Sequence, residues 1–196
     1  MTLVNTDELL STVICGDCQT IIKTLDLPSN VVVITDPPYP DYYAEEYQYK
    51  EGILDFLKDL PYKQIIFWSC KAEFPLDYSA IHIWDKRVPT TPYERIFERN
   101  GKTHYKLYSH YLINSTVAAN FTGDVFNEHP SQKPIKLMQQ LIEDFSEPGD
   151  IILDPFAGSG TTLEAAKKLN RHYIGIEINP DYVKIANERL RQGVLL

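Results

Sequence analysis

The fold is decided by the stretch Ile151-Ile152-Leu153-Asp154-Pro155-Phe156-Ala157-Gly158-Ser159-Gly160. Its first four residues have the apolar pattern of a buried strand, and the glycine-rich remainder is typical of a tight turn. Thr161 to Leu169 has helical spacing, and His172 to Glu177 reads as another strand. A strand, a glycine turn, a helix and a further strand form the repeating unit of α/β sheets that are covered by helices on both faces.

The glycine turn has half of a dinucleotide-binding fingerprint. Gly158 and Gly160 are present, but Leu163 stands at the position of the third glycine. Asp154 brings a carboxylate into the turn, and this charge would repel a pyrophosphate but attract a sulfonium. Glu177, which ends the next strand, is placed to accept hydrogen bonds from both ribose hydroxyls. A nucleoside with a cationic amino-acid tail fits better than NAD, so we expect S-adenosylmethionine as cofactor.

The amino-terminal half must supply the other strands of this sheet, because only one helix follows Glu177. We expect the strand that begins at Thr12 to lie beyond the Tyr173 strand. The Val31 strand is expected on the other side of the Ile151 strand. Further strands are predicted at 64–68 and 81–84, and a helix at 53–60.

Asp36-Pro37-Pro38-Tyr39 directly follows the apolar run 31–35. Two prolines stop the strand and stiffen the backbone, and a residue before proline is held extended. The resulting ledge carries two acceptors, the Asp36 carboxylate and the Pro37 carbonyl, next to an aromatic ring at Tyr39. An amino group on a flat ring, as in a nucleobase, could donate one hydrogen to each acceptor while the ring stacks on Tyr39. An ordinary turn at the end of a strand is the alternative.

A basic, aromatic-rich segment runs from Asp85 to Tyr111 in a chain whose net charge is −8. Asn100-Gly101 within it is a strong hairpin signal. A ribbon of this composition suits phosphates and bases, whereas a solvated edge hairpin that is protected by lysines is the alternative. The candidate nucleic-acid contacts are Lys86, Arg87, Arg95, Arg99, Lys102 and Lys106.

Composition excludes several other classes. The chain is 43% hydrophobic and 23% charged, without an apolar run long enough to span a membrane. The first ten residues lack a signal peptide, so we expect a cytoplasmic protein. Cys15 and Cys18 have the spacing of a metal or redox pair, but a second pair is missing and no metal is expected. The tyrosine-rich segment 40–49 is either a lid over a site or a linker.

Three blocks in this order, 36–39, 129–134 and 154–162, resemble the beta-class amino-group DNA methyltransferases. The resemblance extends from Ile14 to Leu190. It implies a circularly permuted Rossmann-like fold for S-adenosylmethionine-dependent transfer, with a mostly parallel seven-stranded sheet and helices on both faces. It also implies one catalytic domain over 1–196, with a minimal target-recognition insert at about 86–128.

By this resemblance, Asp36 and the Pro37 carbonyl hold the amino group of a base flipped out of duplex DNA, and Tyr39 stacks on that base. The methyl group would pass directly to the base. Aspartate at position 36 resembles the adenine-N6 subgroup, whereas serine is commoner in the cytosine-N4 subgroup. The implied cofactor contacts are Asp17, Ser131, Lys133, Asp154, Phe156, Gly158, Gly160, Thr161 and Glu177.

The resemblance leaves the biological setting open. The small insert predicts either slight sequence specificity or help from a second copy or a partner subunit. An RNA adenine-N6 enzyme and a DNA cytosine-N4 enzyme are alternatives with the same chemistry. A nucleic-acid-binding subunit without catalytic activity is an alternative of another class. A bacterial or phage-infected cell is the expected location.

Overall fold

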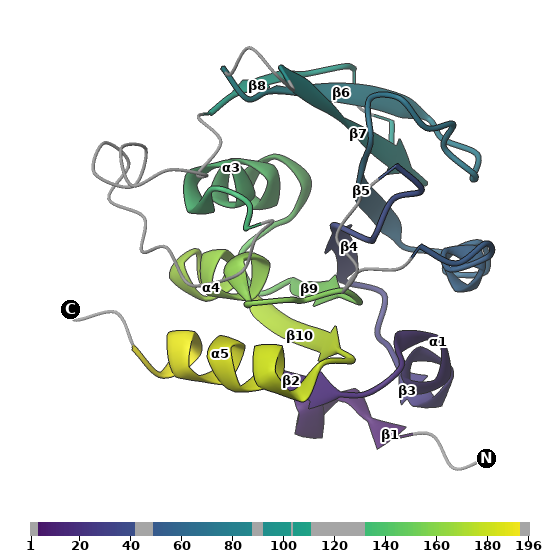
Figure 1. The fold of residues 1–196 in the computed structure, drawn as a ribbon. Coiled ribbons are helices and arrows are strands. Elements are labelled where there is room, and N and C mark those ends of the chain that lie inside the picture. The colour runs from purple at the N-terminus through teal and green to yellow at the C-terminus, as the bar shows by residue number, and fades with distance from the viewer. Residues whose placement is uncertain (1–3, 42–48, 88–91, 103, 111–131, 193–196) are drawn as a thin grey trace.

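A computed structural model describes residues 4–41, 49–87, 92–102, 104–110 and 132–192. Within these ranges the main sheet has eight strands, in the order β2-β10-β9-β4-β5-β7-β6-β8 (Figure 1). Their bounds are β2 (Thr12–Cys15), β4 (Val31–Thr35), β5 (Lys63–Trp68), β6 (Ala80–Asp85), β7 (Tyr93–Arg99), β8 (Leu107–Ser109), β9 (Ile151–Asp154) and β10 (His172–Glu177). The expected number was seven, and the present count includes the three-residue edge strand β8. A separate two-stranded sheet joins β1 (Val4–Asn5) and β3 (Leu25–Asp26).

The strand order predicted for the cofactor half of the sheet is confirmed. β2 lies beyond β10, and β4 lies on the other side of β9, with all four strands parallel. β5 continues the parallel sheet next to β4. β7 runs antiparallel to both of its neighbours, β5 and β6, so the sheet is mixed at this end.

Helices cover both faces of the sheet, as expected. Figure 1 shows α3, α4 and α5 along one face and α1 on the opposite side. Alternate residues of β4 enter different apolar clusters: Val32 and Ile34 pack with the α3 side chains, whereas Val31 and Val33 pack with Cys18 and Ile22. This alternation is what a strand buried on both faces requires. The α-helices are α1 (Cys18–Ile21), α3 (Ile135–Phe145), α4 (Thr161–Lys168) and α5 (Pro180–Arg191), and 3-10 turns span Thr6–Leu9, Ile22–Thr24 and Asp55–Leu57.

The helix expected at 53–60 is wrong, because only the 3-10 turn Asp55–Leu57 forms there. Side chains from β5 and β7 bind carbonyls at and just after the end of this turn. The Gln64 amide donates to the carbonyls of Leu57 and Leu60, at 2.8 and 3.1 Å, and the Arg99 guanidinium also donates to Leu57.

The hairpin expected at Asn100-Gly101 is also wrong. β7 hydrogen-bonds to β5 and β6 within the sheet, and β8 pairs with the far side of β6. Asn100 instead ends β7 in a left-handed conformation, with a φ of 56°, and its side chain donates to the carbonyls of Leu60 and Tyr62. The buried apolar pair Ile96 and Phe97 explains why β7 takes a central position rather than an edge.

The carboxyl-terminal helix begins as the sequence predicts. Asn179 caps α5 by accepting a hydrogen bond from the Asp181 N–H, and Pro180 is its first residue. Among the described residues, none of the helices is long and apolar enough to cross a bilayer. Much of the proposed insert at 86–128 lies outside the described residues, as do Ser131 and most of the tyrosine-rich segment.

Candidate active site

Two neighbouring parallel strands bring the acidic ledge and the glycine turn together. β4 ends at Thr35, directly before Asp36, and β9 ends at Asp154, directly before the turn. Val33 of β4 is level with Leu153 of β9. The Thr35 hydroxyl donates to Asp154 Oδ1 at 2.7 Å, which fastens the two strand ends to each other. The predicted meeting of these two distant segments at one edge of the sheet is confirmed.

Both oxygens of the Asp36 carboxylate accept hydrogen bonds within the protein. The Tyr39 hydroxyl donates to Oδ1, and the Lys133 ammonium donates to Oδ2. Burial raises the pKa of Asp36, although the Lys133 charge acts in the opposite direction. Burial and the Asp36 charge raise the pKa of Tyr39 well above its usual value, so its hydroxyl stays a neutral donor. The Tyr39 ring meets Trp68 edge to face, with the ring centroids 5.5 Å apart.

A second carboxylate, Glu94 of β7, belongs to this corner and was missed in the sequence. Its Oε1 pairs with Lys86, and its Oε2 lies 3.4 Å from Lys133 Nζ and 3.5 Å from the Tyr39 hydroxyl. Burial raises the pKa of Glu94, but the two lysines outweigh burial and leave it below its usual value. No local pattern marks Glu94, because the β6–β7 pairing that sets Trp84 opposite it and brings Lys86 near becomes visible only in the fold.

Lys133 is the buried cation that joins these groups. Burial lowers its pKa, but Asp36 and Glu94 more than compensate and raise it, so the side chain is an ammonium. Its Nζ also lies 5.1 Å from the centre of the Phe67 ring and 5.8 Å from that of Trp84. The resemblance had assigned Lys133 to the cofactor, whereas the structure places its charge on Asp36.

The glycine turn is held tightly by backbone geometry. Gly158 and Gly160 have φ values of 51° and 82°, which favour glycine. A Cβ on Gly160 would lie 2.9 Å from Cβ of Ala186 in α5. Glu177 fixes the turn to β10, because its Oε2 accepts from the Gly158 N–H and its Oε1 from the Asn179 N–H, both at 2.8 Å. Each carboxylate oxygen has a second lone pair, so Glu177 can still accept from a ribose.

Asp154 is almost fully buried, and its pKa lies above the usual value of an aspartate. Burial raises its pKa to about 6, although hydrogen bonds from Thr162, Thr35 and the Phe156 N–H act against burial. A cation near the carboxylate would favour the ionised form and lower this pKa. Asp154 is therefore a site that gains from an approaching positive charge.

A buried arginine of α5 connects the first residue of α4 to the segment that precedes α3. Arg189 donates to the Thr161 hydroxyl and, at 3.0 Å, to Oε1 of Gln132. The contact with Gln132 fixes the backbone next to Lys133. Neither Arg189 nor Gln132 was predicted, because the helical pattern of α5 marks position 189 only as one of several charged residues.

The remaining predicted cofactor residues lie at or near the same edge. Asp17 follows β2, caps α1 and accepts from the Thr20 N–H at 3.0 Å. β2 is paired with β10 and its last residue, Cys15, is level with Glu177, so Asp17 lies two residues beyond that end of the sheet. Phe156 is half-buried and its ring packs against that of Phe56.

The six predicted nucleic-acid contacts do not form one exposed face. Lys86 and Arg99 are buried, the first against Glu94 and the second against Asp77, so neither side chain is on the surface of the free protein. The Arg95 guanidinium donates to the carbonyls of Ser69 and Ala72. Lys106 forms an ion pair with Asp144, whereas Arg87 and Lys102 are exposed.

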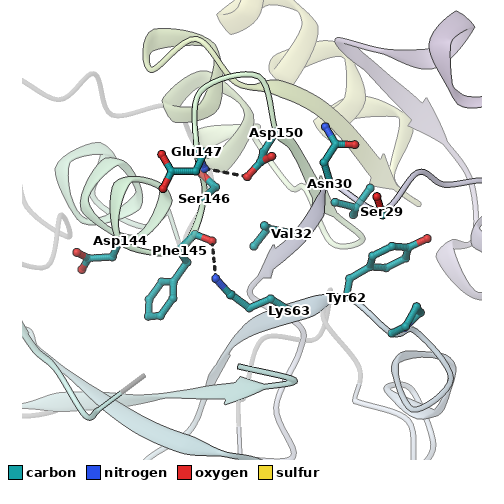
Figure 2. Close-up of a pocket in the computed structure, with 12 residues that line it drawn as sticks. Ser29, Asn30, Val32, Tyr62, Lys63, Asp144, Phe145, Ser146, Glu147 and Asp150 are labelled. Atoms are coloured by element: carbon teal, nitrogen blue, oxygen red, sulfur yellow. Dashed lines mark hydrogen bonds between the residues drawn. The ribbon is translucent and has the colours of Figure 1, made fainter. Parts of the chain in front are cut away.

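A pocket at the opposite edge of the sheet is a separate feature. It lies at the amino ends of β4 and β5, and Figure 2 shows the hydrogen bonds that close its rim. Lys63 donates to the Phe145 carbonyl at 3.1 Å, and the Glu147 N–H donates to Asp150 at 2.8 Å. These contacts hold the end of α3 against the sheet, and the lining residues include none of the predicted site residues.

The sheet, its two helical layers and its acidic edge define the class of protein, an α/β protein with the fold of the S-adenosylmethionine-dependent methyltransferases. The DNA methylase family model matches residues 61–188, and the chain belongs to this family. The Asp36 to Tyr39 ledge lies before the matched segment.

Similar proteins agree with this family. The chain is 43% identical over 95 residues to "Type II methyltransferase M.HindIII" of Haemophilus influenzae, which is 48% of this chain and 31% of that protein. It is 42% identical over 87 residues to "DNA adenine methyltransferase YhdJ" of Escherichia coli, 42% of this chain and 30% of the relative. The chain thus spans about a third of the length of the curated relatives that it matches. The solved M1.HpyAVI–SAM complex is 25% identical, with a TM-score of 0.61 over 91% of this chain and 99% of that one.

Proposed function

We propose that this chain is the catalytic unit of a DNA methyltransferase that transfers a methyl group from S-adenosylmethionine to the N6 amino group of adenine. The observation that carries the proposal is the position of the Asp36-Pro37 ledge next to the Asp154 turn, on adjacent strand ends. One segment offers acceptors for an amino group, and the other offers a buried carboxylate for a cation. Membership of the DNA methylase family supports the same reaction.

The residues at the glycine turn fit the proposed cofactor. Gly158 and Gly160 allow the tight left-handed turn after β9, and Asp154 would favour a sulfonium or an ammonium close by. Glu177 would accept from the ribose, with Asp17 near the adenine and Thr161 and Phe156 along the turn. S-adenosylmethionine supplies a methyl group activated by positively charged sulfur. The similar M1.HpyAVI structure, a complex with SAM, supports this assignment.

Asp36 and Pro37 would prepare the target nitrogen. The lone pair of an exocyclic amino group is delocalised into the ring, which makes the nitrogen a poor nucleophile. Two acceptors that draw its hydrogens favour a pyramidal nitrogen and direct the lone pair at the methyl carbon. Positioning and fixed charge therefore supply most of the rate enhancement. A flipped base would stack on Tyr39, which offsets part of the cost of flipping.

To test the substrate, the purified protein is incubated with S-adenosylmethionine that carries a labelled methyl group and with duplex DNA, single-stranded DNA or RNA. The methylated nucleosides are then identified. We expect N6-methyladenine in DNA. N4-methylcytosine would select the alternative base, and label only in RNA would select the alternative polymer. Sequencing of modified bases in DNA from expressing cells then identifies the site.

Asp36→Asn is the matched variant for this experiment. It keeps the size of the side chain but removes the negative charge, so we expect a loss of methyl transfer of at least a hundredfold with cofactor affinity largely intact. Turnover close to that of the unmodified protein would contradict the assignment of Asp36. Failure of the unmodified chain to methylate any polymer while it binds cofactor would instead favour a subunit without catalytic activity, or one that needs a partner.

A further inference from the structure

In the free protein, the Asp36 carboxylate is not fully available to accept a hydrogen bond from the amino group of a target base. Its Oδ2 already holds the Lys133 ammonium, whose side chain is only 9% exposed. The ammonium and an adenine amino group are the same kind of donor for this carboxylate. A full positive charge in contact with Asp36 also cancels the charge that would draw the amino hydrogens, and it would repel a sulfonium nearby.

A second acceptor for the ammonium is already in place. Glu94 Oε2 lies 3.4 Å from Lys133 Nζ, so the ammonium can move toward Glu94 by rotation about the last bonds of its side chain. Lys86 pairs with the other oxygen, Oε1, and thereby holds the Glu94 carboxylate in position. The rings of Phe67 and Trp84 lie within 6 Å of Nζ, where they favour a cation.

We propose that Lys133 has two positions, on Asp36 in the free protein and on Glu94 when a target base is bound. Glu94 is then a positioning residue that acts through Lys133, and Lys86 supports it. The inference rests on the proposed function, since the target amino group is what replaces the ammonium on Asp36. The exchange leaves neither the buried lysine nor the half-buried aspartate without a partner, a condition that charges removed from water require.

The exchange predicts that Glu94 controls how well the protein recognises an amino group. In the Glu94→Gln variant the ammonium loses its charged alternative and stays on Asp36. Removal of the ammonium in the Glu94→Gln/Lys133→Met double variant frees Asp36 again. If Glu94 acts by positioning Lys133, the second substitution should restore the recognition of the amino group that the first removes. If the two residues contribute independently, the two losses of recognition should add up.

The readout is the ratio of affinities for two duplexes that differ only at the target base, adenine or purine, which lacks the 6-amino group. The duplexes contain the recognition sequence that is identified by sequencing. Binding is measured with S-adenosylhomocysteine present, so that no methyl group is transferred. We expect the unmodified protein to prefer adenine by about tenfold, equivalent to about 1.4 kcal/mol. The ratio should fall toward one in Glu94→Gln and return in the double variant.

Glu98→Gln is the control, because Glu98 is a buried carboxylate on the same strand that pairs with His82. This variant should lose stability but keep the adenine preference. An unchanged ratio in Glu94→Gln, or a double variant that is no better than Glu94→Gln, would overturn the exchange. Methyl transfer by the unmodified protein is measured alongside, so that failure of the proposed function is recognised separately.

Discussion

Individual carboxylates carry most of the chemistry of this site, and only some of them could be predicted from the sequence. Asp36 and Asp154 could be predicted because each directly follows an apolar strand and precedes proline. Glu94 could not, because its partners Lys86 and Lys133 come from other segments of the chain. A charge that ends a strand is visible in a sequence, whereas a charge that is paired across the fold is not.

Asp154 makes cofactor binding depend on pH. With a pKa of about 6 in the free protein, the carboxylate is ionised above pH 6 and neutral below it. Because a cationic ligand prefers the ionised form, affinity for S-adenosylmethionine should be constant near pH 8. Below pH 6 it should weaken by up to about tenfold per pH unit. Calorimetric titration from pH 5 to 8 checks this, and the same profile in Asp154→Asn would contradict the assignment.

Asp154 should also lower the stability of the protein without ligand. Its pKa is raised from 3.8 in the unfolded chain to about 6, so the folded state binds more protons between these values. Stability from this group therefore falls as pH rises through that window and stays lower at pH 7. We expect Asp154→Asn to be more stable at pH 7 by about 1–3 kcal/mol, yet weaker in cofactor binding. Urea unfolding at pH 7 measures the first effect, and an equally stable variant would contradict it.

At the scale of elements, β7 shows where sequence patterns fail. Its four charged residues suggested an exposed ribbon, but the strand lies in the sheet between β5 and β6. Each charge has an internal partner: Glu94 with lysines, Arg95 with carbonyls, Glu98 with His82 and Arg99 with Asp77. The strands around the glycine turn were predictable because they are apolar throughout, as in a sheet buried on both faces.

The His82–Glu98 pair between β6 and β7 should make stability fall in mild acid. His82 Nδ1 accepts from the Lys106 N–H at 3.0 Å, so the ring is neutral, and burial lowers its pKa despite the neighbouring Glu98. Below about pH 6.5 the unfolded chain takes up a proton that the folded state resists, so stability declines as pH falls. We expect His82→Gln to reduce this decline between pH 7.5 and 5.5, as measured by urea unfolding. An unchanged slope would show that His82 does not cause it.

The turn after β7 should tolerate no side chain at Gly101. A Cβ there would lie 1.6 Å from Glu98 Oε1, and Glu98 is fully buried. Gly101→Ala should therefore destabilise the protein by about 1–3 kcal/mol through overpacking. Gly149→Ala is the comparison, because it has a positive φ but no atom within 4 Å of the added Cβ. Gly149→Ala should show only the cost of its backbone strain, and a Gly101→Ala melting temperature equal to that of the unmodified protein would contradict the predicted clash.

For the whole molecule, charge and size shape the expected encounter with DNA. The chain has a net charge of −8, and two of its six candidate basic residues are buried in ion pairs. Under the proposed function, the basic residues that remain exposed, Arg87 and Lys102, would carry the phosphate contacts. The meeting of Asp36 and Asp154 at one edge of the sheet was predictable, because the order of the strands along the chain determines it. The DNA-binding surface was not, because it depends on which basic side chains stay exposed after folding.

The salt dependence of DNA binding separates the exposed basic residues from the buried ones. Each phosphate contact contributes a slope of about −0.9 to log K against log salt. Replacing exposed Arg87 and Lys102 by glutamine should therefore make the slope shallower by about two, with stability unchanged. Lys86→Met and Arg99→Met should instead lower the melting temperature and leave the slope as it was, because both side chains are buried and paired, with Glu94 and Asp77 respectively. Fluorescence anisotropy at several salt concentrations, together with thermal unfolding, measures both effects. A shallower slope in the buried variants would mean that these side chains leave their ion pairs to contact DNA.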